Sequence, residues 1–201
     1  MTDSRRAILA GAARVIARRG VRGLRVADLA AEAGVSTALV YYHFKDRTGI
    51  LRHALAFIGD RADRYTTTGD GGAAGRPSDP RQLLEQTLLL EFQELPEVRE
   101  NSTAWGELRA HSVFDPELRD ELAAAGTAWV AEVAGHLAAL CPAAPAGAVT
   151  ATAERLTALL EGLSVRWLSG LLPLDHARGL LREAIGVELG RLSSPPVPEI
   201  D

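Results

Sequence analysis

The segment from Ala33 to Lys45, AGVSTALVYYHFK, constrains the fold of this chain more than any other segment. Gly34 is a turn residue between two helical patterns, and the hydroxyl of Ser36 can cap the helix that follows. Before the turn, VADLAAEA (26–33) carries apolar residues at helical spacing. A helix, a tight turn and a second helix predict a helix-turn-helix, whose second helix enters the major groove of DNA.

The second helix of this motif has a narrow apolar face and an aromatic outer face. At about 100° per residue, Phe44 falls beside Val40 on the buried side, whereas Tyr42 falls on the far side and Tyr41 flanks it. A soluble protein needs a reason to expose two tyrosines, and phenol hydroxyls that reach phosphate oxygens would supply one. Taken alone, the segment could also form a buried helical hairpin.

The charge distribution favours the DNA-binding alternative. Residues 1–64 carry 12 Lys and Arg against 6 Asp and Glu, a net charge of +6, whereas residues 65–201 carry 10 against 20, a net charge of −10. A basic head on an acidic body is typical of a protein that holds DNA at one end. Chance clustering of solvated arginines would give the same count, but it would not explain why the basic part coincides with the helix-turn-helix.

On these features the chain resembles the TetR (tetracycline-repressor-like) family of one-component bacterial regulators. The matching features are an amphipathic helix that ends at Gly20, the segments VADLAAEAGVS and VYYHFKDRTGIL, and the length of 201 residues. The motif match covers roughly residues 5–56. One position departs from the family, which often caps the second helix with Ser or Thr. Arg25 stands there and could contact a phosphate instead.

The resemblance implies an all-α fold and a division of labour along the chain. Residues 1–47 are expected to form the DNA-binding domain, linked by a helix over 46–65 to a ligand-binding and dimerisation domain over 48–192, with a flexible tail over 193–201. Tyr42 and Lys45 are expected at phosphates, and Thr37, Ala38 and Leu39 near base edges. The full set expected at the DNA is Arg25, Ser36, Thr37, Ala38, Leu39, Tyr41, Tyr42, His43 and Lys45.

The body is predicted to be wholly helical. Proline and aspartate signals predict helices from Asp79 to Pro96, over 97–113, from Pro116 to about residue 140, over 148–169, and from an Asp175 cap to about residue 192. The segment TTTGDGGAAGRPSD (66–79) predicts a mobile loop and the best domain boundary.

Three tryptophans in three body helices suggest contact with a small-molecule effector, although each could equally lie in the core or at a dimer interface. The expected ligand-binding residues are Phe92, Trp105, Glu107, His111, Trp129 and Trp167. Carboxylates and aromatic rings favour a cationic or hydroxylated ligand. A ligand among these helices would move the 46–65 helix and change the spacing of the two heads.

The last two helices carry more leucine than one core face needs, so they are predicted to pair across a two-fold axis in a homodimer. The expected interface residues are Leu156, Leu160, Leu163, Leu181, Ile185 and Leu189. Two heads about one DNA turn or more apart would read a palindromic double-stranded operator.

Other functional classes find little support. There is no metal-ligand spacing, no phosphate-binding loop and no cofactor motif, and the single cysteine lacks the context of a nucleophile, so we expect neither a cofactor nor an enzyme. No apolar run reaches the roughly 18 residues of a membrane span, and one cysteine fits a reducing cytoplasm. The predicted function is a repressor released by a small molecule. The alternatives are an activator or dual regulator, and a helical small-molecule-binding protein without DNA function.

Overall fold

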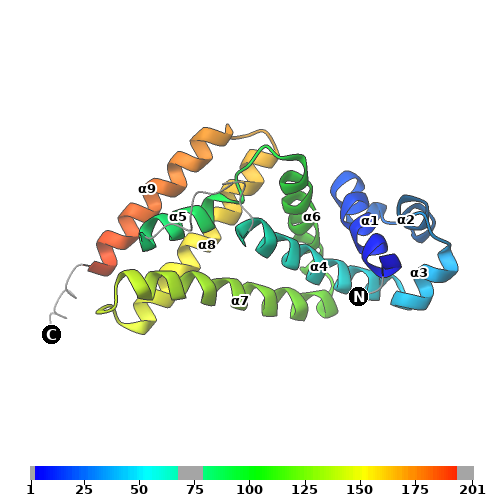
Figure 1. Ribbon diagram of the computed structural model, residues 1–201, viewed down its shortest axis with the longest axis horizontal. Helices are drawn as coiled ribbons and strands as arrows, with labels where there is room; N and C mark the ends of the chain where they lie inside the picture. The colour runs from blue at the N-terminus through cyan, green and yellow to red at the C-terminus, as the bar shows by residue number, and fades with distance from the viewer. Residues whose placement is uncertain (1–2, 68–78, 194–201) are drawn as a thin grey trace. The chain divides into compact units, whose positions relative to one another are not determined.

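The computed structural model describes residues 3–67 and 79–193, and in these ranges all regular structure is helical (Figure 1). The helices are α1 (Asp3–Arg19), the 3-10 turn η1 (Val21–Gly23), α2 (Val26–Ala33), α3 (Thr37–Phe44), α4 (Arg47–Thr67), α5 (Pro80–Leu89), α6 (Pro96–Ser112), α7 (Pro116–Leu140), α8 (Ala146–Leu168) and α9 (Leu174–Ser193). The all-α prediction is confirmed. Most of the predicted loop over 66–79 and of the predicted tail lies outside the described residues.

Helix starts follow signals that are visible in the sequence. Prolines occupy the first helical position of α5, α6 and α7, where a missing N–H costs no hydrogen bond. The side chain of Asp79 accepts a hydrogen bond from Arg81 N at 3.0 Å, and that of Asp115 accepts one from Leu118 N at 3.3 Å. No helix within the described ranges combines the length and the apolar character that crossing a membrane requires.

Two predicted helix ends are wrong. The helix after Asp79 stops at Leu89 and does not run to Pro96. The chain turns there and buries Phe92 completely, and the Phe92 carbonyl accepts a hydrogen bond from Arg178 Nε of α9 at 2.9 Å. Tertiary contacts therefore replace the helical bonds. The second correction concerns Asp175, which lies within the first turn of α9 and so is not its cap.

The described helices pack as two compact units, each with its own apolar core. The first unit contains α1, η1, α2, α3, α4, α6 and the part of α7 up to Gly126; the second contains α5, the rest of α7, α8 and α9. In the first unit, α1 packs against α2, α4 and α6. In the second, α9 packs against α5 and α8. Packing thus groups α4 and α6 with the head, whereas the functional boundary at residue 47 remains a prediction.

Candidate nucleic-acid interface

A glycine fixes the turn between α2 and α3. Gly34 has φ 66° and ψ 34°, a left-handed conformation that glycine adopts without steric penalty. Gly34 N donates to Ala31 O at 3.2 Å, and Val35 N donates to Ala30 O at 2.9 Å. These two bonds are the Schellman pattern, which satisfies carbonyls that the end of a helix leaves open. The direction in which α3 leaves the turn follows from this local geometry.

The recognition helix α3 is capped and anchored as the sequence predicts. Ser36 is its N-cap, and its side-chain oxygen accepts a hydrogen bond from Leu39 N at 3.2 Å. Val40 and Phe44, four residues apart, are both buried in the core of the first unit. Two apolar anchors on one face hold the short helix against α1 and α4 and leave its other face toward solvent.

The outer face of α3 presents the side chains expected to meet DNA. Tyr42 is 81% exposed and Tyr41 is 50% exposed. Thr37 and Ala38 are also exposed, whereas Leu39 is half-buried. The prediction that the tyrosines point outward is confirmed. Neither phenol stabilises the protein's own core, so their hydroxyls remain available to an acceptor on a partner.

An unusual backbone turn places Lys45 directly after α3. Lys45 has φ 64° and ψ −57°, and it is the one residue other than glycine with positive φ in the described part of the chain. Asp46 N donates to Phe44 O across it at 2.7 Å, which closes a strained γ-turn. Asp46 then caps α4, because its Oδ1 accepts from Gly49 N at 2.7 Å. A Cβ on Gly49 would lie 2.2 Å from Phe44 O, so only glycine permits this approach.

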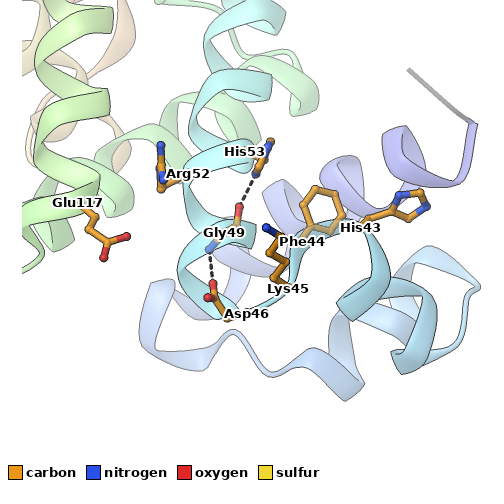
Figure 2. A pocket seen from close by; sticks show the side chains of 8 residues that line it. All are labelled: His43, Phe44, Lys45, Asp46, Gly49, Arg52, His53 and Glu117. Carbon is orange, nitrogen blue, oxygen red and sulfur yellow. Dashed lines mark hydrogen bonds between the residues drawn. The ribbon is translucent and has the colours of Figure 1, made fainter.

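A cavity of about 250 Å³ lies beside this turn, between the end of α3 and the start of α4 (Figure 2). Its lining residues are His43, Phe44, Lys45, Asp46, Gly49, Arg52, His53 and Glu117. The His53 ring is held by a hydrogen bond between Nδ1 and Gly49 O at 2.7 Å. Arg52 pairs with Glu121 at 2.5 Å, and this bond raises the pKa of the guanidinium. The lining is therefore of mixed charge, and Lys45 is its exposed cation without an acidic partner among the described residues.

Several arginines of the head are used to hold its helices together. Arg14 Nε lies 2.6 Å from Glu32 Oε1, and Arg18 pairs with the other carboxylate oxygen. The bond from Arg14, followed by that from Arg18, lowers the pKa of Glu32. Arg19 pairs with Asp28 at 2.8 Å. These contacts tie α1 to α2, and they remove three cations from the set that a phosphate could attract.

Other cations are left for a partner. Within the described residues, Arg6, Arg22, Arg25 and Lys45 are exposed and form no hydrogen bond or ion pair through their side chains. Arg25 is the N-cap residue of α2 and makes no side-chain cap bond there, as the sequence indicated. His43 contacts Ser4, with Nε2 and Oγ 3.2 Å apart. Arg6 and Arg22 were not among the predicted DNA contacts, and only the structure separates them from the paired arginines.

Two family models together match most of the chain. Residues 8–54 match the model described as "Bacterial regulatory proteins, tetR family", and residues 80–190 match "BetI-type transcriptional repressor, C-terminal". The chain belongs to the TetR family. It is therefore a helix-turn-helix transcriptional regulator, and the resemblance seen in the sequence is confirmed.

Relatives of this regulator agree with that assignment over nearly its whole length. It is 46% identical to a putative TetR-family transcriptional regulator from Rhodococcus sp., with 94% of this chain and 100% of that chain covered and a TM-score of 0.82. It is 28% identical to a putative transcriptional regulator from Saccharomonospora viridis solved in complex with choline, with 92% and 97% covered and a TM-score of 0.77. It is also 28% identical to the HTH-type transcriptional regulator BetI of Burkholderia cenocepacia (strain HI2424), with 90% of each chain covered.

The six predicted ligand-binding residues are divided between the two units, and their role in binding a ligand remains a prediction. Phe92 and Trp167 belong to the core of the second unit, where their ring centroids are 6.0 Å apart, and the partly buried Trp129 packs against this core. Trp105 packs against the core of the first unit. His111, also in the first unit, lies with Nε2 3.8 Å from Asp115 Oδ2.

Glu107 is the member of this set whose environment differs most from the expectation. Its Oε2 accepts a hydrogen bond from Val21 N at 3.1 Å, within the first unit. The carboxylate is thus directed at the loop between α1 and α2, and this contact gives no support to its assignment as a ligand-binding group.

The predicted dimer residues also lie in an unexpected place. Leu156, Leu160, Leu163, Leu181 and Ile185 are buried by the chain's own helices, and Leu189 is half-buried against the same core. These side chains pack within the core of the second unit, and their role at an interface with a second copy remains a prediction. The apolar side chains that these helices do expose are Leu159, Val165 and Val187.

Proposed function

We propose that this TetR-family regulator is a homodimeric repressor that leaves a palindromic operator when a small organic cation binds. The observation that carries DNA binding is the exposed face of α3, with Tyr41 and Tyr42 beside the unpaired Lys45. Tyr42 and Lys45 contact phosphates, whereas Thr37, Ala38 and Leu39 approach base edges. Because its partner is genomic DNA, the protein acts in the bacterial cytoplasm.

The unpaired arginines provide a direct test of this docking. Arg22→Ala and Arg25→Ala should each weaken binding to an operator selected from random duplexes, and should make the salt dependence shallower by about 0.9 for each phosphate that the variant no longer reaches. The matched control is Arg19→Ala, because the Arg19 guanidinium is already paired with Asp28. Equal salt slopes for all three variants and the wild type would contradict the proposed docking.

The homodimer is proposed to form through the outward faces of α8 and α9. Leu159 and Val165 on α8 are 36% and 47% exposed, and Val187 on α9 is 49% exposed. Two heads are needed because one recognition helix reads only a few base pairs, and a two-fold axis matches a palindrome.

A charge placed on this face tests the dimer. Val165→Asp should give a monomer in sedimentation and lose operator binding, because a carboxylate would be buried against the partner. Leu171→Asp is the control, since Leu171 is 78% exposed in the turn between α8 and α9. A dimeric Val165→Asp protein with normal affinity would rule out this face.

The proposed ligand is a quaternary ammonium compound of the choline type. A relative was solved with choline, and the second unit of this chain holds Phe92 and Trp167 in its apolar core with Trp129 packed against that core. The faces of such rings attract organic cations. Close by in the chain, Glu91 Oε1 accepts a hydrogen bond from Ser164 Oγ at 2.9 Å and contributes a negative charge. Release from DNA requires tighter binding of the ligand to the conformation that does not bind DNA.

Choline is the probe for this part of the proposal. Titration of choline into the protein–operator complex should release the DNA, and Trp167→Phe should weaken that response more than Trp105→Phe. Trp105 serves as the comparison because it packs in the first unit. If choline leaves the complex intact while the operator still binds, the ligand class is wrong and the DNA-binding proposal stands.

A further inference from the structure

The backbone of Val21 is held from both sides by charged side chains. Glu107 of α6 accepts a hydrogen bond from Val21 N at 3.1 Å, and Arg47 of α4 donates one from Nη2 to Val21 O at 2.6 Å. The Val21 side chain is 1% exposed and belongs to the core of the first unit. Val21 begins η1, the connection between α1 and the helix-turn-helix, so the two bonds fix the point from which the DNA-binding helices start.

Gly20, the residue before Val21, lies close to the same carboxylate. Gly20 has φ 70° and ψ 169°, a region that is essentially restricted to glycine. A Cβ at this position would lie 2.7 Å from Glu107 Oε2, closer than side chains tolerate. Glycine is thus required for two separate reasons, the backbone conformation and the space that the Glu107 carboxylate occupies.

A third bond joins the two helices that hold Val21. Asn101 of α6 is 5% exposed, and its Nδ2 donates to Ile58 O of α4 at 3.2 Å. The contacts α6 to η1, α4 to η1 and α6 to α4 therefore form a closed triangle within the first unit. Such a closed arrangement resists rotation of the head better than any one bond, because each contact limits the freedom that the others leave.

We propose that Glu107 is a positioning residue for DNA binding. It attaches α6 to the loop that precedes the helix-turn-helix and so sets the orientation in which α2 and α3 meet the DNA, without contacting DNA itself. The inference rests on DNA binding by the head and is independent of the proposed ligand.

Because Glu107 is charged, a positioning role can be distinguished from a direct electrostatic effect of its carboxylate on DNA binding. Glu107 is an exposed carboxylate next to a basic head, so removing its charge should strengthen DNA binding if field effects alone mattered. Removing a positioning contact should weaken binding instead. The two explanations therefore predict opposite signs for Glu107→Ala.

The experiment compares Glu107→Ala, Glu107→Gln and the control Glu97→Ala, which removes an exposed carboxylate from the other end of α6. Affinity for a selected operator is measured over a range of salt concentrations, and hydrogen exchange reports on the Val21 amide. We expect Glu107→Ala to lose about tenfold in affinity per head, and therefore about 100-fold for the dimer, with an unchanged salt slope, as for the loss of one hydrogen bond to a charged group in each head. Glu107→Gln keeps an acceptor oxygen and should restore the affinity, and Val21 protection should fall only in Glu107→Ala.

A double-mutant cycle with Gly20 gives a second measurement. Gly20→Ala should weaken operator binding less in the Glu107→Ala background than in the wild type, because the clash with the carboxylate is then gone and only the backbone strain remains. Operator affinity of Glu107→Ala equal to or above that of Glu97→Ala would overturn the proposal, as would a changed salt slope, which would indicate a direct phosphate effect. Additive effects in the cycle would also overturn it.

Discussion

Lys45 combines a strained backbone with an exposed charge, so one substitution should improve folding and impair DNA binding. Its φ of 64° and ψ of −57° lie in a region that costs a non-glycine residue about 1–3 kcal/mol. Glycine avoids most of this strain but gives up about 0.5–1 kcal/mol through the greater freedom of the unfolded chain. Lys45→Gly is therefore expected to raise the free energy of unfolding by about 1 kcal/mol.

The effect on DNA binding has the opposite sign. The binding constant for duplex DNA varies with salt concentration to a power of about −0.9 per phosphate contact. At roughly 0.15 M salt, each contact therefore raises the binding constant about fivefold. A dimer in which each head reaches one phosphate fewer should bind about 30-fold more weakly, and its salt slope should become shallower by about 1.8. The reduction should be equal for operator and random DNA, because phosphate contacts carry no sequence information.

The comparison that isolates the strain is Lys45→Gly against Lys45→Ala. Both variants lack the ammonium group, so they should bind DNA equally weakly. Alanine retains the penalty for positive φ, so only the glycine variant should melt higher, by about 2–4 °C for a chain of this size. A glycine variant no more stable than the alanine variant would refute the strain argument, and unchanged salt slopes would refute the phosphate contact.

Substitutions at three further residues test other parts of the structure. Glu188 is 7% exposed and its pKa is lowered, mainly by the bond from Arg155, so its stabilisation is present above pH 4.5 and is lost as the pH falls through the lowered folded-state pKa. Glu188→Gln should therefore lower the free energy of unfolding by about 1–3 kcal/mol at neutral pH. The difference in stability between the variant and the wild type should become smaller when thermal unfolding is measured at acid pH. Asn101 Oδ1 is buried and finds no donor among the described residues. Asn101→Leu should therefore be about as stable as the wild type in urea unfolding. Asn101→Ala should lower the free energy of unfolding by about 1–3 kcal/mol. Tyr42→Phe removes a neutral donor, so titrations should show equally weaker binding to operator and random DNA with an unchanged salt slope.

The helix-turn-helix could be predicted in detail because its determinants are local. Gly34, Ser36 and Asp46 each act on backbone groups within four residues of themselves. Interactions between residues that are close in the sequence can be predicted from the sequence itself, without knowledge of the rest of the fold. The outward direction of Tyr41 and Tyr42 follows in the same way from the buried positions of their neighbours on one helical turn.

The partners of the body helices could not be predicted by the same reasoning. Leucine spacing shows that α8 and α9 each have an apolar face, but it does not show whether the chain itself or a second copy covers that face. Leu181 and Ile185 pack within the protomer, whereas Val187, two residues further on, is exposed. The contact between Glu107 and Val21 could not be predicted, because the two residues lie 86 positions apart in the chain.

The charge count predicted a class of partner without identifying the residues that meet it. The +6 of residues 1–64 includes arginines that are paired with Asp28 and Glu32, and a neutral pair attracts phosphate only weakly beyond a Debye length of about 8 Å. The field at the DNA is therefore set mainly by the cations that have no acidic partner among the described residues, which are Arg5, Arg6, Arg22, Arg25, Lys45 and Arg47. Pairing depends on which helices pack together, so the choice among arginines is a property of the tertiary fold, although their number is a property of the sequence.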